Sequence, residues 1–184
     1  MVLGVCGKIA SGKSEVLKIL REKGFYCVEA DKIVHDLYKK GAQGARKIEV
    51  VFGEKFLKEN GEVDRVKLRD EVFEDENKLK LLNDIIHPVV YEEIKSILSR
   101  HHEKNIAIES VYFDFEFLGD FVSELLWIDR PKDEILKVLI NDRGFTRDLA
   151  EKVFDYIQKL KETDFVLKND GSLSKLKEEV LSLF

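Results

Sequence analysis

The sequence predicts an α/β protein built on a five-stranded parallel sheet. Short apolar runs without polar alternation are typical of strands buried on both faces of such a sheet, and helical stretches separate them. Only 2 prolines and 11 glycines punctuate the 184 residues, which favours long regular elements and short loops. With 44% hydrophobic and 36% charged residues, the chain suits a single domain over residues 1–184.

The expected strands are apolar runs followed by turn residues or helical sequence. A helix begins at Gly12 with Val16, Leu17 and Leu20 on one face, and Gly24 ends it. Alternation of strands and helices predicts parallel pairing through right-handed crossovers. The strand candidates are residues 2–6, 25–28, 106–108, 125–128 and 165–167.

Residues 29–105 are far more than one crossover helix needs, so an inserted helical region is expected. Breaks are predicted at residues 41–44, at Asn60-Gly61 and at Pro88. Pro131 opens a later helix that stops near Arg143-Gly144. The helical stretches of the insertion are residues 31–40, 66–73, 76–86 and 89–102, and another helix is expected over residues 147–161.

Charge and cysteine content exclude several classes of protein. The net charge of −5 argues against broad nucleic-acid binding. Cys6 and Cys27 each lie in an apolar run, where a free thiol behaves as a small hydrophobe, so no disulfide scaffold is expected. Neither a membrane span nor a signal peptide is indicated, which predicts a cytoplasmic protein without a membrane partner.

The strongest functional motif is Gly7-Lys8-Ile9-Ala10-Ser11-Gly12-Lys13-Ser14, which fits the P-loop pattern G-x-x-x-x-G-K-[ST] between a strand and a helix. Backbone N–H groups of such a loop converge on phosphate oxygens, and the helix adds its positive dipole end. Lys13 would bridge the β and γ phosphates, and Ser14 would offer its hydroxyl to Mg²⁺. A merely tight turn would explain Gly7 and Gly12 but not Lys13 and Ser14.

A kinase is favoured over a GTPase, because the chain lacks an Asp-x-x-Gly segment beside an Asn-Lys-x-Asp motif. Asp31 follows the second strand, and ligands of open parallel sheets bind beyond the carboxyl ends of the strands. A carboxylate there could accept a proton from an attacking hydroxyl or orient a water on Mg²⁺. The alternative is that Asp31 caps the helix that carries Ile33, Val34 and Leu37.

Further segments follow the loop in a fixed order, and together they resemble the dephospho-CoA kinase family over nearly the whole chain. The resemblance implies transfer of phosphate from ATP to the ribose 3′-hydroxyl of dephospho-CoA, which gives CoA and ADP in the last step of CoA biosynthesis. It also implies a P-loop kinase core, a CoA-binding insertion over about 32–104 and a lid over about 131–147. The segments are Glu29-Ala30-Asp31 with His35, Phe52-Gly53, Asn60 to Arg65 with Leu68, Val72-Phe73, Ile86-His87-Pro88 and Asp164 to Ser172.

The resemblance assigns roles residue by residue. Lys13 and Asp31 are the expected catalytic residues, with Asp31 as base, and Ser14 and Asp31 would hold Mg²⁺ directly or through water. ATP binding is expected at Gly7, Ala10, Ser11, Gly12, Lys13, Ser14, Glu15 and Asn169, and acceptor binding at Asp31, His35, Arg65, His87 and Asp114.

Three of these assignments have structural alternatives. Arg65 could form a surface salt bridge with Asp64 or Glu62. His87 could simply cap a helix break before Pro88. His35 could pack or hydrogen-bond within its own helix.

The chain departs from the family pattern at several positions. Glu29 stands where an Asp is usual, and Asp114, with Glu116 second, corresponds to the acid of the segment after the third strand. The Gln and two Arg of the lid fall on Glu134, Lys137 and Asn141. The aromatic residues Tyr112, Phe113, Phe115 and Phe117 would line a pantetheine groove or belong to the core.

Arg143 is the candidate catalytic cation of the lid, because it stands beside Gly144 and its planar fork suits phosphate oxygens. Lys137 and Arg147 are the other cations nearby, and Arg143 could instead stabilise the end of its helix. Two other functions compete with the one that the resemblance implies. They are another P-loop kinase acting on a nucleoside or nucleotide, and a nucleotide-binding sensor with weak catalysis. The oligomeric state is not predicted.

Overall fold

The computed structural model describes residues 1–111, 121–157 and 163–184. It divides the chain into two compact units, Met1–Glu29 with Leu98–Phe184 and Ala30–Ile97, which are described separately. The predicted aromatic groove and the acids Asp114 and Glu116 lie outside the described residues.

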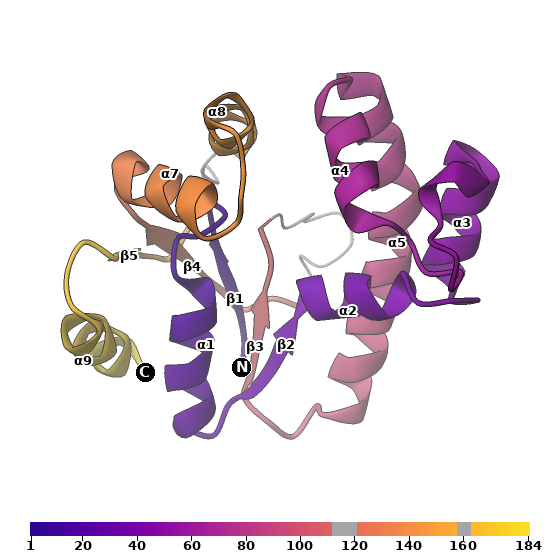
Figure 1. Cartoon of the computed structure of the whole chain (residues 1–184). Helices are drawn as coiled ribbons and strands as arrows, with labels where there is room; N and C mark the ends of the chain where they lie inside the picture. The colour runs from indigo at the N-terminus through magenta and orange to yellow at the C-terminus, as the bar shows by residue number, and fades with distance from the viewer. Residues whose placement is uncertain (112–120, 158–162) are drawn as a thin grey trace. The chain divides into compact units, whose positions relative to one another are not determined.

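The first unit contains a five-stranded parallel sheet with the order β2-β3-β1-β4-β5 (Figure 1). The sheet class and all five predicted strands are confirmed. The register aligns Val5 of the first strand with Glu109 of the third, and Gly7 with Ile128 of the fourth. The strands are β1 (Val2–Gly7), β2 (Tyr26–Glu29), β3 (Ile106–Glu109), β4 (Glu124–Asp129) and β5 (Phe165–Lys168).

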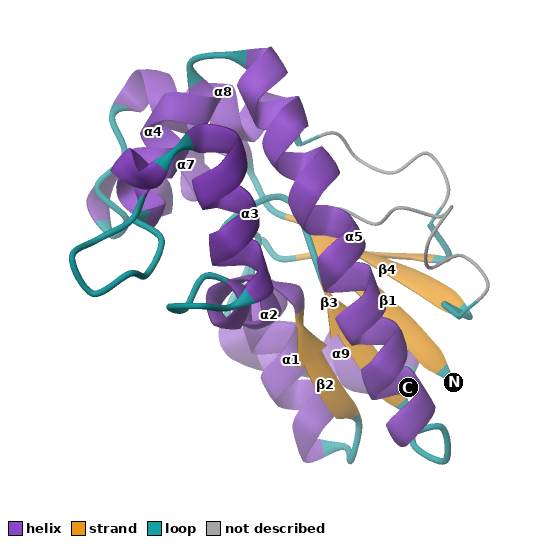
Figure 2. Cartoon of the chain, turned by 90° about the vertical axis from the view of Figure 1, so that its right-hand side faces the viewer, coloured by secondary structure: helices purple, strands orange, loops and turns teal. Residues whose placement is uncertain are grey.

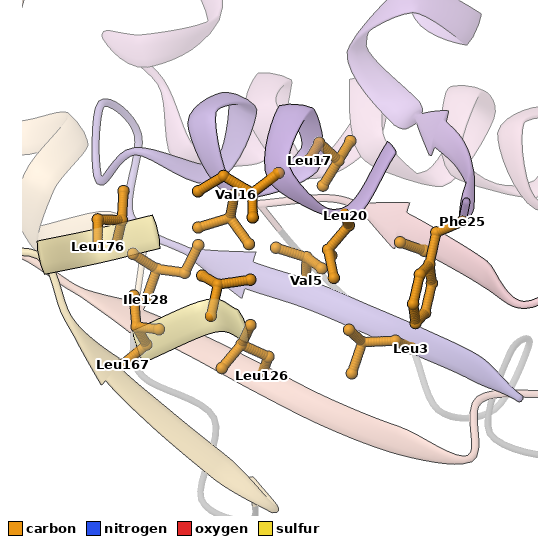
Figure 3. Packing of buried hydrophobic residues seen from close by; sticks show 13 residues of the cluster. Leu3, Val5, Val16, Leu17, Leu20, Phe25, Leu126, Ile128, Leu167 and Leu176 are labelled. Atoms are coloured by element: carbon orange, nitrogen blue, oxygen red, sulfur yellow. The ribbon is translucent and has the colours of Figure 1, made fainter. Parts of the chain in front are cut away.

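One face of this sheet is covered by α1 (Lys13–Glu22) and α9 (Leu173–Leu183), as Figure 1 shows. Strand side chains alternate between faces, so every second apolar residue meets these helices. Figure 3 shows this core, in which sheet residues interlock with Val16, Leu17 and Leu20 of α1. The sheet contributes Leu3, Val5, Leu126, Ile128 and Leu167, and α9 contributes Leu176 and Val180.

Helix α9 was missed by the sequence analysis, although the chain carries two signals for it. The Ser172 hydroxyl accepts a hydrogen bond from the Lys175 N–H at 3.3 Å, which is an N-cap. Leu176 and Val180, four residues apart, are the buried residues of the helix.

Both cysteines are free, and burial raises the pKa of the Cys6 thiol to about 12.

Two more helices of the first unit, α7 (Lys132–Asn141) and α8 (Arg147–Tyr156), share a small apolar core of their own. Pro131 is the N-cap of α7, one residue before the helix that it was expected to open. Gly144 has φ +68° in the turn between the two helices, and the Thr146 hydroxyl caps α8 by accepting from the Leu149 N–H. The helix end predicted near Arg143-Gly144 is therefore confirmed, with α7 ending at Asn141.

The second unit is helical. Its elements are α2 (Ala30–Leu37), α3 (Gln43–Phe52), the 3₁₀ turn η1 (Glu54–Phe56), α4 (Arg65–Phe73) and α5 (Glu76–Arg100), whose last turn belongs to the first unit. Helix α3 was missed, because Gly41 and Gly44 were read as a break. Gly44 is instead inside the helix, where a Cβ would come within 2.7 Å of the Leu37 carbonyl oxygen, so glycine permits a close approach of backbones.

The predicted break at Pro88 is wrong, because α5 continues through it as one helix (Figure 2). Proline removes one backbone hydrogen bond but its φ is compatible with a helix. Ile86 and Val90 are buried on either side of Pro88, and Ile94 is buried one turn further on. Tertiary packing therefore holds the two halves together despite the lost bond. None of the helices that the structure describes is long and apolar enough to cross a membrane.

Candidate active site

The P-loop joins β1 to α1, and its two consensus glycines are required by the backbone. A Cβ on Gly7 would lie 2.7 Å from the Ile128 carbonyl oxygen of the neighbouring β4. Gly12 has φ +105°, and a Cβ there would collide with the Asn169 side-chain amide. Both positions combine a φ that favours glycine with a close approach, to a backbone oxygen at Gly7 and to a side-chain amide at Gly12.

Lys13 is folded back over the loop, and its ammonium donates to the carbonyl oxygens of Gly7 at 3.2 Å and Lys8 at 3.1 Å. The same nitrogen lies 3.5 Å from Oε1 of Glu109, and both side chains are only 7% exposed. A buried carboxylate thus keeps a charged ammonium inside the loop, since an isolated buried charge would be unfavourable.

Glu109 is a site residue that the sequence analysis missed. It is the last residue of the otherwise apolar strand β3 and is buried at the carboxyl end of the sheet. An acid at the end of a buried strand is itself a signal, because it stands where parallel sheets bind ligands. Asp114 and Glu116, the acids expected after this strand, lie outside the described residues.

Two donors from distant parts of the chain fix the carbonyl groups of the loop. The Asn169 side-chain amide donates to the Ser11 carbonyl at 2.8 Å, and the Asn169 backbone N–H donates to the Asp129 carbonyl at 2.7 Å. The Arg130 guanidinium donates to the Ala10 carbonyl at 2.9 Å. Asn169 was expected to bind ATP. Arg130 was missed, because no sequence motif around it indicates a contact with the loop.

The remaining loop positions differ in exposure. Ser14 is exposed on the first turn of α1, where its hydroxyl is open to a ligand. Glu15 forms an ion pair with Lys18 at 2.7 Å along the same helix. Ser11 is fully buried, and among the described residues its hydroxyl has no hydrogen-bond partner. The N-terminus of α1 and this unsatisfied hydroxyl are both features that an oxyanion can satisfy.

A pocket of about 390 Å³ lies at the carboxyl ends of β4 and β5. The pocket adjoins the loop. Its lining residue Arg130 donates to a loop carbonyl, and so does Asn169, the neighbour of the lining residue Asp170. The Phe154 ring at this pocket already has two cations against it, since the Lys8 ammonium lies 4.0 Å and the Lys132 ammonium 4.8 Å from its centroid. The pocket is lined by Asp129, Arg130, Pro131, Lys132, Phe154, Lys168 and Asp170.

Glu29 ends β2, and its carboxylate pairs with the Arg21 guanidinium of α1 at 3.1 Å. Helix α2 begins at Ala30, so Asp31 lies inside its first turn, exposed to solvent. The alternative that Asp31 is the N-cap is therefore wrong. An N-cap precedes the first helical residue, whereas Asp31 is the second residue of a helix that follows strand β2 directly.

Within the second unit the structure brings His35 and Arg65 together, with Nδ1 and Nη1 3.4 Å apart. The Asp64 carboxylate accepts from the Lys67 N–H as the N-cap of α4, and in the part of the chain that the structure describes Arg65 forms no ion pair with Asp64 or Glu62. The salt-bridge alternative for Arg65 is therefore not observed.

His87 lies in the middle of α5 rather than at a helix break, so the capping alternative for it is wrong. Its ring centroid is 5.9 Å from that of Tyr91, one turn further along the helix.

The predicted lid positions on α7 form a local charge network. Glu134 lies 2.9 Å from the Lys137 ammonium and 3.8 Å from Arg130. The hydrogen bond from Lys137 lowers the pKa of Glu134 and raises that of Lys137. Arg143 is exposed beyond the helix, and no ion pair engages its guanidinium among residues 1–111, 121–157 and 163–184. Arg143 is thus less engaged than Lys137.

A preformed cage for a metal ion is not present in the described part of the chain, where no three His, Cys, Asp or Glu side chains gather suitably. The chemistry of the loop nevertheless suits Mg²⁺, which is usually held by one or two oxygen ligands together with the phosphates of its nucleotide. Among oxygen-bearing side chains, Ser14 belongs to the P-loop and Glu109 lies beside its Lys13.

The fold and this loop define a P-loop kinase. The structure resembles a dephospho-CoA kinase from Campylobacter jejuni, with a TM-score of 0.62 and 26% identity over 99% of this chain and 94% of that one. A shikimate kinase from Aquifex aeolicus shares the fold, with a TM-score of 0.55 and 18% identity over 99% and 95% of the two chains.

The particular family follows from the sequence comparisons. The family model described as dephospho-CoA kinase matches residues 1–175. A dephospho-CoA kinase from Fusobacterium nucleatum is 36% identical over 98% of this chain and 95% of its own length. One from Carboxydothermus hydrogenoformans is 34% identical over 99% and 92%. The chain belongs to the dephospho-CoA kinase family.

Proposed function

We propose that the protein transfers the γ-phosphate of ATP to the ribose 3′-hydroxyl of dephospho-CoA, giving CoA and ADP. The observation that carries the proposal is the intact P-loop with buried Lys13, in a chain that matches the family along 175 residues. In this reaction the acceptor oxygen bonds to the γ-phosphorus, the bond from that phosphorus to the bridging oxygen of ADP breaks, and the hydroxyl proton passes to a base.

The donor nucleotide is bound by the loop and by the pocket next to it. The backbone N–H groups and the helix end hold the phosphates, and the buried Ser11 hydroxyl supplies a further donor. Lys13 exchanges its carbonyl partners for β- and γ-phosphate oxygens, where negative charge accumulates during transfer. The adenine ring occupies the pocket beside Arg130 and Pro131. Asn169 and Arg130 keep the loop in the binding conformation.

The protein residues that fit Mg²⁺ are the Ser14 hydroxyl as a direct ligand and Glu109 through a bound water. Asp31 was expected in the same role and stays a candidate. When bound with ATP, the ion would offset the negative charge that develops on the phosphates during transfer. Glu109 would be released for this contact when Lys13 turns to the phosphates.

Four of the five proposed acceptor-binding residues, Asp31, His35, Arg65 and His87, belong to the second unit. Asp31, in the first turn of α2, takes the proton of the ribose hydroxyl. The Arg65 guanidinium, steadied by His35, binds the anionic diphosphate of dephospho-CoA, because a planar fork recognises phosphate oxygens in pairs. His87 and Asp114 complete the proposed acceptor set, the insertion over about 32–104 supplies its surface, and the lid over about 131–147 supplies Arg143.

The test is turnover with separate acceptors. Purified protein is incubated with ATP, Mg²⁺ and either dephospho-CoA, a nucleoside, a nucleotide or shikimate, and mass spectrometry identifies the phosphorylated product. The Lys13→Ala protein, purified identically, controls for contaminating kinases. Phosphorylation of dephospho-CoA alone supports the proposal. Transfer to a nucleoside or nucleotide instead selects another P-loop kinase, and ATP binding without transfer to any acceptor selects a nucleotide sensor.

A further inference from the structure

The P-loop contains a second lysine, Lys8, whose side chain leaves the phosphate site. Its ammonium donates to the carbonyl oxygens of Phe154 at 2.6 Å and Ile157 at 2.5 Å. Both acceptors lie at the C-terminal end of α8, about 150 residues away in the sequence. The last carbonyls of a helix have no partner within it, so a cation that donates to them acts as a C-cap.

The surroundings of the ammonium are suited to a lasting contact. It lies 4.0 Å from the centroid of the Phe154 ring, a favourable position for a cation over an aromatic face. The negative end of the α8 dipole adds to the attraction. Burial lowers the pKa of Lys8, and Asp155 opposes that effect.

The same stretch of the loop packs into the apolar core of α7 and α8. Ile9 and Ala10 lie against Ile135, Leu139 and Ala150, which are fully buried in that core. Arg130, just before α7, holds the Ala10 carbonyl. The loop is therefore attached at both ends of the helix pair, by Arg130 before α7 and by Lys8 after α8.

The two lysines of the loop consequently have opposite orientations. Lys13 folds inward to Glu109 and the loop carbonyls, whereas Lys8 reaches outward to another helix. Because the backbone N–H of Lys8 is independent of its side chain, replacing the side chain leaves the N–H donors of the loop in place. The Lys8 side chain can therefore be tested separately from phosphate binding.

We propose that Lys8 is a positioning residue that fastens the end of α8 to the phosphate-binding loop, so that the loop and the α7–α8 pair move as one body. Through this attachment the loop holds the connection between the helices, which carries Arg143, at a defined place relative to the bound nucleotide. The kinetic consequence of the proposal rests on the proposed function, but the attachment itself does not depend on the identity of the acceptor.

The test measures backbone hydrogen exchange of α8 in the full chain without nucleotide, and then steady-state kinetics. In Lys8→Met we expect exchange in the last turn of α8 to rise about 10-fold, since two charge-assisted hydrogen bonds are lost. Lys8→Arg should stay within about threefold of wild type, because a guanidinium can donate to both carbonyls. Lys152→Met is the matched control, since Lys152 is an exposed lysine of the same helix, and it should leave exchange unchanged.

In the kinetic measurements we expect kcat of Lys8→Met to fall about 10-fold while KM for ATP changes by less than about twofold. Lys8→Arg should restore kcat. Unchanged α8 exchange in Lys8→Met, or an equal rise in Lys152→Met, would overturn the proposal. So would a large rise in KM for ATP with normal α8 exchange, which would make Lys8 a phosphate ligand. Amides of β1 and β4 report global folding, and Lys8→Gln replaces Lys8→Met if the latter does not fold. If dephospho-CoA proves not to be the acceptor, hydrogen exchange of α8 still tests whether Lys8 fastens this helix to the loop.

Discussion

The Lys13 ammonium lies 3.5 Å from the Glu109 carboxylate, and this buried ion pair joins the start of α1 to the end of β3. Neither charge would be stable there alone, since burial of an unpaired ion is strongly unfavourable. According to the proposed function, the phosphates of ATP would replace Glu109 as the partner of Lys13. The Glu109 carboxylate would then be available to the magnesium site. In this structure each charge of the pair is thus compensated by the other.

Replacing Lys13 by alanine should lower kcat by about 10² to 10³, because one charge-stabilising contact is lost where charge develops. Glu109 would lose its cation, so Tm should fall as well. The double variant Lys13→Met with Glu109→Gln removes both charges and should recover much of the Tm without recovering activity. Transfer assays and calorimetry measure the two effects. Near-normal turnover of Lys13→Ala would reject the assignment of the donor site.

Asp31→Asn should lower kcat much more than it changes KM for dephospho-CoA. The amide has a similar volume but cannot accept the hydroxyl proton, and loss of general base catalysis commonly costs about 10² to 10⁴ in rate. Asp36→Asn, on the same helix but paired with Lys39 at 2.6 Å, is the control and should have little effect. Equal rates for wild type and Asp31→Asn would remove Asp31 from the catalytic residues.

Arg65→Ala should raise KM for dephospho-CoA about 10-fold or more and leave KM for ATP nearly unchanged, because charge-assisted bonds to an anionic acceptor are lost. Arg69→Ala is the matched control one turn along α4, where Arg69 pairs with Asp70 at 2.7 Å. Initial rates with each substrate varied in turn measure both constants. Parallel changes in the two KM values would contradict an acceptor role.

Gly12→Ala should destabilise the protein more than Gly24→Ala does. Both glycines have positive φ, +105° and +93°, so each alanine incurs about 1 to 2 kcal/mol of backbone strain. Only at Gly12 would the new Cβ also meet Asn169, whereas nothing lies within 4 Å at Gly24. Denaturant unfolding measures the difference. Adding Asn169→Ala to Gly12→Ala should recover part of the excess, and a simple sum of the two losses would contradict the close approach.

Arg143→Lys should reduce kcat at saturating substrates with little change in Tm, since lysine cannot reproduce a two-pronged contact with phosphate. Lys137→Ala should have the smaller effect, because Lys137 is already paired with Glu134 at 2.9 Å. Kinetics and thermal melts of both variants test this. A larger defect in Lys137→Ala would move the role of phosphate clamp to Lys137.

Features that depend on residues close together in the chain could be predicted from the sequence. Continuous apolar runs predicted all five strands, since such runs are stable only when both faces of a strand are buried. The P-loop could be recognised because eight consecutive residues contain its backbone donors, its lysine and the beginning of its helix. Helix α9 was equally local, with its Ser172 cap, and could have been found.

The distant groups that complete the site are brought to it by the tertiary fold. Glu109 meets Lys13 because β3 pairs with β1, and Asn169 and Arg130 reach the loop because β4 and β5 follow on the other side of β1. Packing also kept α5 whole through Pro88 and brought Gly44 of α3 against Leu37. These contacts depend on strand order and burial, which join residues far apart in the chain, whereas sequence patterns report only the preferences of short segments.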